Sequence, residues 1–170
     1  MPTPTRAFPV IAAAALAVFA LAAPASAQTF KAELSGAANV PDPVKTPATG
    51  HLELTVAANG QSINYVLTVK DIENVIEGDI HLGPAVANGP LVVKLFHGGA
   101  KKGPFNGVLA QGKIDAADLA GPMGGAKLSE LIDELKAGNA YVNVHTSDGV
   151  DPPNSGPGDY RLGEIRGQIK

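Results

Sequence analysis

Apolar residues at every second position are the feature of this sequence that most restricts its fold. The segments 51–56 and 62–69 both alternate in this way, and successive side chains of a strand point to opposite faces. Between them lie Asn59 and Gly60, a typical hairpin turn because both residue types tolerate positive φ. We therefore predict a β-hairpin. Its buried face would carry Leu52, Leu54, Val56, Ile63, Tyr65, Leu67 and Val69.

Further short segments have the length and alternation of strands. They are residues 29–34, 78–82, 91–96, 106–114, 140–145 and 163–169. The 20 Gly and 14 Pro follow no Gly-X-Y period, so they indicate many tight turns rather than a collagen-like chain. About eight strands with frequent turns predict an all-β fold, an antiparallel Greek-key β-sandwich or barrel.

One segment departs from the period of two. In residues 127–137, four apolar residues follow the i, i+3, i+4, i+7 spacing of an amphipathic helix, and Gly138 stands where a helix commonly ends. We expect one short helix there, closing an end of the β fold. Residues 36–50, 98–107 and 147–159 are rich in Gly, Pro or acids and are expected to be loops.

The first 27 residues have the layout of a secretory signal peptide. Arg6 precedes the apolar run 10–23, and Ala25-Ser26-Ala27 resembles a cleavage site. The run is shorter than the roughly 20 residues that span a bilayer; the alternative is an uncleaved anchor. We expect residues 28–170 to form a single domain that is periplasmic or secreted, with no membrane span after cleavage.

Composition excludes several classes of function. The net charge is −3 without a basic run, which argues against a nucleic-acid partner. The absence of Cys excludes disulfides, Cys-ligated zinc and thiol catalysis. No G-x-S-x-G motif is present, and Pro104 follows the glycine-rich segment 98–103 where a phosphate-binding loop would have Lys and Ser or Thr. A binding domain is therefore favoured over an enzyme.

The polar faces of three predicted strands carry groups suited to a binding site. The candidate residues are Asp79, His81, Tyr141, Asn143, His145, Glu164 and Arg166. These strands are far apart in the sequence, and their polar faces would have no common reason to carry such residues unless the strands meet in space. We predict that His81 and His145 lie within about 8 Å of each other, the reach of a diagonal cross-strand pair, with Glu164 or Arg166 touching one of them.

Two imidazoles and a carboxylate are suitable ligands for zinc or copper(II). The candidate metal ligands are His81, His145, Asp79 and Glu164; the alternative is a hydrogen-bonded polar patch without metal. Because a neighbouring carboxylate raises the pKa of an imidazole, at least one of the two histidines is expected to titrate above about 6.5.

Eight motifs occur in an order that resembles a known family. They are residues 32–36, 40–41, 46–50, 80–84, 88–93, 135–139, 141–146 and 163–169, the most specific being Y-V-N-V-H-T and G-E-I-R-G-Q. Together they resemble the CHRD domain, which is repeated in chordin and found singly in exported bacterial proteins. The resemblance extends over residues 29–169.

The resemblance implies an extracellular all-β domain. We expect it to act as a binding module rather than as an enzyme. Its ligand would be an extracytoplasmic protein or a small molecule. The alternative is a periplasmic protein that binds copper or zinc, with or without redox activity. Family members often have A-H-I-H where this chain has Gly78-Asp79-Ile80-His81, so an aspartate stands here in place of the first histidine.

Overall fold

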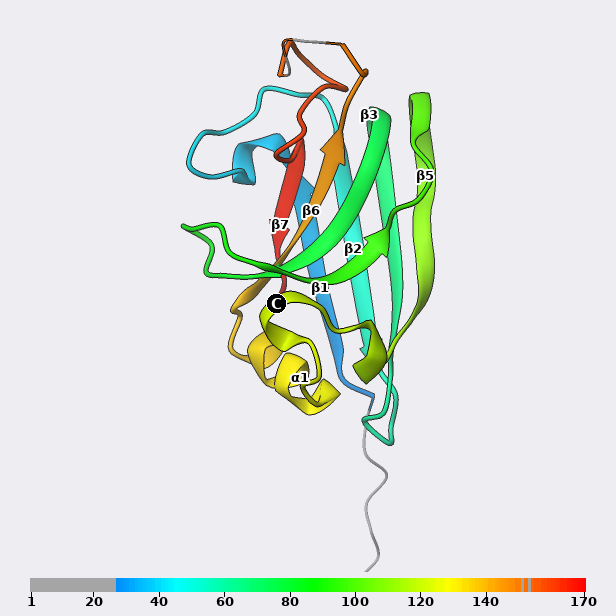
Figure 1. Cartoon of the computed structure of the whole chain (residues 1–170), viewed down its shortest axis with the longest axis vertical. Coiled ribbons are helices and arrows are strands. Elements are labelled where there is room, and N and C mark those ends of the chain that lie inside the picture. The colour runs from blue at the N-terminus through cyan, green and yellow to red at the C-terminus, as the bar shows by residue number, and fades with distance from the viewer. Residues whose placement is uncertain (1–26, 151, 153) are drawn as a thin grey trace, which may run out of the picture.

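Antiparallel strands make up most of the computed structural model, which describes residues 27–150, 152 and 154–170 (Figure 1). The strands are β1 (Thr29–Ser35), β2 (Thr49–Val56), β3 (Ile63–Leu82), β4 (Leu91–Phe96), β5 (Lys101–Ile114), β6 (Ala140–Thr146) and β7 (Ile165–Gln168). The α-helix is α1 (Leu128–Lys136), and short 3-10 turns occupy Gly36–Ala38, Ala116–Asp118 and Gly121–Met123. The predicted all-β class and the single short helix are confirmed. The predicted signal peptide lies outside the described residues, apart from Ala27.

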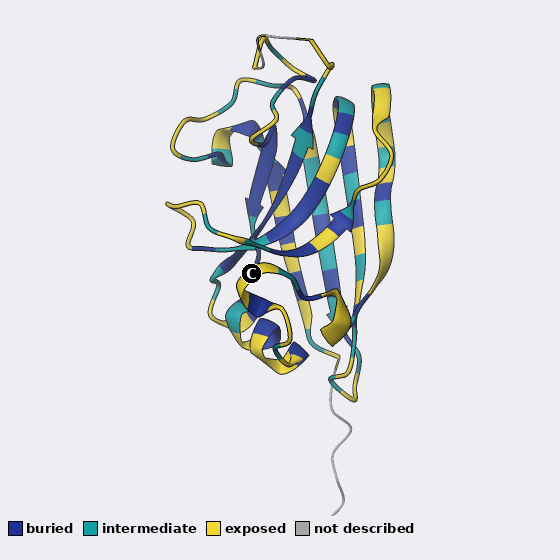
Figure 2. Cartoon of the chain, in the orientation of Figure 1, coloured by how far each residue is buried: buried dark blue, intermediate teal, exposed yellow. Residues whose placement is uncertain are grey.

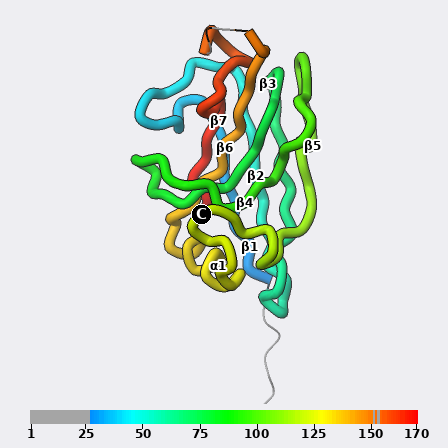
Figure 3. Tube along the Cα trace, viewed as in Figure 1, coloured from blue at the N-terminus to red at the C-terminus, as the bar shows by residue number. Residues whose placement is uncertain are grey.

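The sheet closes into a barrel because β3 pairs with two strands along one edge. Its first part, Ile63–Lys70, pairs with β2, and its last part, from Val75 to Leu82, pairs with β6. β1 links β2 to β7, and β7 pairs with β6, which completes the ring (Figure 3). β4 and β5 pair with the other edge of β3 and lie outside the ring.

Continuity of β3 is the main difference from the expected strands. The sequence suggested separate strands at 62–69 and 78–82, but one strand spans both and bends between them. Asp71 and Asn74 have φ of 52° and 53°, and the pairing register with β5 shifts there. Such bulges bend a strand without ending it. The strand expected at 106–114 likewise begins earlier, at Lys101, so most of the predicted loop 98–107 is sheet.

The interior of the barrel is apolar, as the period of two predicts. Leu52, Leu54, Ile63 and Leu67 are fully buried, and Val56 pairs with Ile63 across the predicted turn. The apolar side of α1 closes one end of the barrel (Figure 2). Its buried residues are Leu128, Leu131, Ile132 and Leu135.

The outer face formed by the end of β3, β6 and β7 is also buried, although its residues are polar. Asn143 is 5 % exposed, Arg166 2 % and Glu164 0 %. Three segments supply hydrogen-bond partners to this face: residues 36–48, 83–90 and 154–164. The barrel therefore has an apolar layer inside and a buried polar layer outside. Among the described residues, no helix is long and apolar enough to cross a membrane.

The buried face of the hairpin can be tested by substitution. Leu67→Ala should lower the free energy of unfolding by about 2–5 kcal/mol, because it leaves a cavity in the barrel interior. Thr55→Ala, on the partly exposed face of β2, should change it by less than about 1 kcal/mol. Urea unfolding of both variants measures the difference. Equal losses would mean that the two faces are not distinguished by burial.

Candidate functional site

The strand register brings the two predicted histidines together on the outer face of the barrel. His81 pairs with Tyr141, and Asp79 pairs with Asn143 one row further along. His145 lies beyond that row, and the two imidazole ring centroids are 6.2 Å apart. The predicted approach of His81 and His145 within about 8 Å is therefore confirmed.

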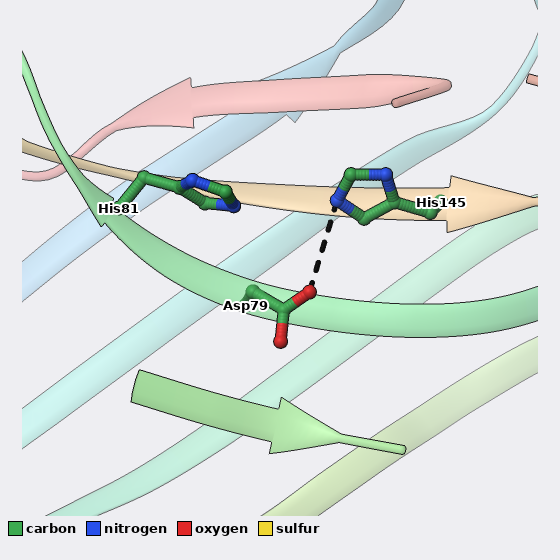
Figure 4. A group of neighbouring side chains, drawn as sticks. All are labelled: Asp79, His81 and His145. Carbon is green, nitrogen blue, oxygen red and sulfur yellow. Dashed lines mark ion pairs between the residues drawn. The ribbon is translucent and has the colours of Figure 1, made fainter. Parts of the chain in front are cut away.

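Asp79 completes a group of three possible metal ligands with the two histidines (Figure 4). One ligand atom from each residue lies within 4.8 Å of the other two. His145 Nε2 is 3.8 Å from Asp79 Oδ2. Asp79 itself is 1 % exposed. The group is thus a close cluster of two imidazoles and a carboxylate beneath the surface.

Main-chain carbonyls determine which nitrogen of each ring is free. His81 Nδ1 is 3.0 Å from the carbonyl oxygen of Gly89, and His145 Nδ1 is 2.9 Å from that of Arg161. A carbonyl only accepts hydrogen bonds, so each Nδ1 must donate. In the neutral rings Nε2 is then unprotonated, and its lone pair is free to bind a metal.

The two Nε2 atoms and one oxygen of Asp79 are buried without hydrogen-bond partners. Within the described part of the chain, His81 Nε2, His145 Nε2 and Asp79 Oδ1 are inaccessible and make no hydrogen bond. Buried polar atoms without partners are uncommon in native proteins and call for an explanation such as an ion. The three atoms belong to the same cluster, which makes the cluster a candidate metal centre.

Burial lowers the pKa of both histidines, so the predicted rise is wrong. Desolvation is the largest cause for His81 and for His145. Asp79 does not offset it, because burial and the nearby charge of Glu77 raise the pKa of Asp79 to about 7. An acid that is itself reluctant to ionise does little to stabilise an imidazolium. The His145–Asp79 contact is an ion pair only if the ring is protonated, which burial opposes.

Glu164 is not brought into the cluster. Its carboxylate accepts hydrogen bonds from the Thr46 and Thr146 hydroxyls and from the backbone N–H of Gly158. It thereby joins three segments of chain around the end of β6. The predicted contact of Glu164 with a histidine is absent from the hydrogen bonds and ion pairs of the described residues, because these partners occupy its oxygens.

Arg166 contacts Tyr141 rather than either histidine. Its guanidinium lies over the Tyr141 ring, 3.9 Å from the centroid. The same Tyr141 ring stacks with His81, at 5.0 Å between centroids and 12° between planes. No hydrogen bond joins Arg166 to His81 or His145 in the described part of the chain, so the predicted direct contact is replaced by an aromatic one.

The remaining predicted residue, Asn143, borders the cluster opposite Asp79. Its Nδ2 donates to the carbonyl of Leu162 at 3.2 Å, whereas its Oδ1 is buried without a partner. Sequence reasoning missed Gly89 and Arg161, which act through main-chain carbonyls that every residue possesses. It also missed Gln168, whose amide donates to the carbonyls of Gly83, Gly138 and Ala140.

Comparison with known proteins identifies one family. A family model described as the CHRD domain matches residues 30–153, which is most of the chain. The matched range contains the Asp79, His81 and His145 cluster. Neither the curated proteins nor the solved structures gave a match.

The raised pKa of Asp79 predicts how stability of the metal-free protein depends on pH. The folded state holds this proton more tightly than the unfolded state does, so the contribution of Asp79 to stability falls as pH rises from about 4 to about 7. Asp79→Asn removes the buried charge. It should raise the free energy of unfolding by about 1–3 kcal/mol at pH 8 and have little effect below about pH 4.

Urea unfolding at both pH values in the presence of a chelator measures this dependence. Asp133→Asn, on the exposed side of α1, is the matched control and should change stability little at either pH. A loss of stability in Asp79→Asn at pH 8 would contradict the expected desolvation of the carboxylate.

Proposed function

Because this chain belongs to the CHRD domain family, we propose that it is an exported binding domain whose ligand is a divalent transition metal, zinc or copper(II). One observation carries the proposal: a ligand atom from each of the two imidazoles and from the carboxylate lies within 4.8 Å of the others, and all three residues leave a buried atom without a hydrogen bond. A cation between the three residues would give both imidazole Nε2 atoms a partner and would neutralise the buried carboxylate.

The proposed ligands are Nε2 of His81, Nε2 of His145 and a carboxylate oxygen of Asp79. Zinc bonds to nitrogen and oxygen at about 2.0–2.2 Å, which places neighbouring tetrahedral ligands about 3.3 Å apart. The 3.8 Å between His145 Nε2 and Asp79 Oδ2 needs only a small side-chain shift to reach that spacing. Both rings already donate Nδ1–H to a carbonyl, the arrangement that orients histidines at metal sites.

The donor set favours zinc or copper(II) among the common metals. Imidazole suits both ions, whereas calcium and magnesium prefer sites made of oxygen ligands. The chain has no cysteine to supply a thiolate, which softer ions favour. A bound dication would also stabilise the ionised form of Asp79, so metal binding should release a proton and weaken at acid pH.

The alternative of a metal-free polar patch accounts less well for this cluster. In such a patch the imidazole nitrogens would bond to neighbouring side chains. Instead the nearest carboxylate oxygen is 3.8 Å from His145 Nε2, beyond hydrogen-bond distance. Glu164, the other candidate acid, is bonded to Thr46, Thr146 and Gly158.

Metal binding can be measured with the other two of the four histidines as internal controls. Calorimetric titration of residues 28–170 with zinc, and the visible spectrum with copper(II), should show one site with Kd below about 10 μM. His81→Ala and His145→Ala should each weaken binding about 100-fold or more, because each removes a ligand.

His51→Ala and His97→Ala supply the matched controls. His51 contacts Glu33 on the surface and His97 is exposed, so neither change should alter the affinity. Wild-type binding weaker than 10 μM at pH 7.5, or binding that is lost with His51 or His97, would refute the proposal.

The proposal includes export, supported by the charged, apolar and small-residue order of residues 1–27. The mature chain should begin at Gln28, immediately before β1. Intact-mass measurement of protein from the cell envelope or medium tests this expectation. A mass that retains residues 1–27 would instead support an uncleaved anchor.

A further inference from the structure

Residues 83–90 form an irregular loop between β3 and β4, yet they hold one of the proposed metal ligands. The carbonyl of Gly89 accepts the hydrogen bond from His81 Nδ1. Loss of this hydrogen bond would remove the contact that keeps the proton on Nδ1 of His81 and orients its ring. The path of the loop therefore matters for His81 although none of its side chains belongs to the cluster.

Arg166 makes three of the hydrogen bonds that fix this loop. Its guanidinium donates to the carbonyls of Pro84, Ala85 and Ala87 at 3.1, 3.1 and 3.3 Å. A fourth bond, at 3.2 Å, reaches Ala38 in the neighbouring segment. The planar, forked guanidinium is suited to bonding several carbonyls at once, and a lysine ammonium is not.

The charge of Arg166 is not compensated by an acid. Arg166 is 2 % exposed, and within the described residues no carboxylate forms an ion pair with it. Burying a guanidinium without a counter-ion is costly, and carbonyl dipoles and the face of Tyr141 are what offset the cost here. The desolvation of this guanidinium opposes folding, so its presence here indicates that the position of the loop is important.

Tyr141 connects Arg166 to the cluster. Its hydroxyl accepts a hydrogen bond from the backbone N–H of Gly89 at 3.0 Å. Its ring contacts both the Arg166 guanidinium and the His81 imidazole. His81 is thus held by two contacts, the Gly89 carbonyl at Nδ1 and the stacked Tyr141 ring on its face.

We propose that Arg166 is a positioning residue of the metal centre. By holding loop 83–90 and Tyr141, it fixes the ring orientation and the Nδ1–H tautomer of His81, so that Nε2 faces His145 and Asp79 before a metal arrives. The consequence for metal affinity rests on the proposed function. The effect on the His81 ring does not, because it is a property of the metal-free protein.

His145 provides an internal control for this inference. Its Nδ1 bonds to the carbonyl of Arg161 in the segment 154–164, and Arg166 makes no hydrogen bond to that segment within the described residues. Loss of the Arg166 contacts should therefore disturb His81 and leave His145 in place. A general loss of structure would disturb both rings.

The experiment compares Arg166→Lys with the wild type by two readouts. Long-range ¹H–¹⁵N correlation spectra of the metal-free protein report the tautomer of each histidine. Wild-type His81 and His145 should both carry the proton on Nδ1; in Arg166→Lys, His81 alone should become a mixture of tautomers. Zinc affinity should fall about 10- to 100-fold, as it does when outer hydrogen-bond partners of metal ligands are removed.

Three further variants separate positioning from stability. Tyr141→Phe keeps the ring but removes the bond to Gly89, and should shift the His81 tautomer even if Arg166→Lys does not fold. Lys136→Ala changes an exposed lysine of α1 whose side chain contacts Asp133, and should leave both readouts unchanged. Leu67→Val should lower stability without changing zinc affinity.

Each result has a definite meaning. An unchanged His81 tautomer in both Arg166→Lys and Tyr141→Phe would overturn the positioning role, as would equal disturbance of His81 and His145. If the wild type binds no zinc but His81 still responds selectively, the proposed function fails and the positioning role stands. If zinc binds and His81 responds selectively with reduced affinity, both are supported.

Discussion

The architecture of this domain depends on a single strand that changes partners. Pairing of β3 first with β2 and then with β6 closes the ring, and the bend at Asp71 and Asn74 allows the change of direction. A flat strand of the same length would leave β2 and β6 on one continuous sheet without closure. The bend also turns the last residues of β3 toward β6 and β7. The cluster therefore exists because the barrel closes in this place.

Closure alone would leave the polar residues of the last β3 segment on the surface. Loops bury them, and burial determines their chemistry. A surface histidine beside an aspartate would be a simple ion pair, worth little and screened by salt. Here desolvation raises the pKa of Asp79 and lowers that of His81 and His145. The same three groups thus favour their neutral forms and, without a cation, keep unpaired atoms beneath the surface.

The sequence predicts the parts of this arrangement that depend on periodicity. Alternation in β2 and β3 identifies Leu52 and Leu67 as interior residues, and the i+2 spacing of Asp79 and His81 places both on one face. The approach of His145 follows from equivalent polar faces on separate strands. Spacing does not reveal burial of the outer face, since loops far along the chain provide it. For that reason the predicted rise in the pKa of the histidines was wrong. Glu164 was wrongly assigned to the cluster for the same reason, because its partners Thr46 and Gly158 lie in those loops.

The two carbonyls that hold the imidazoles place different constraints on how this protein can diverge. At Arg161 the hydrogen bond to His145 comes from the main-chain carbonyl, so it does not depend on which side chain stands there provided the backbone keeps its course. Gly89 has no such freedom, because a Cβ there would lie 1.8 Å from the carbonyl oxygen of Leu82. Related sequences are therefore expected to vary at position 161, whose carbonyl holds His145, and to keep glycine at position 89, whose carbonyl holds His81. Two equivalent hydrogen bonds would then leave unequal traces in the evolutionary record.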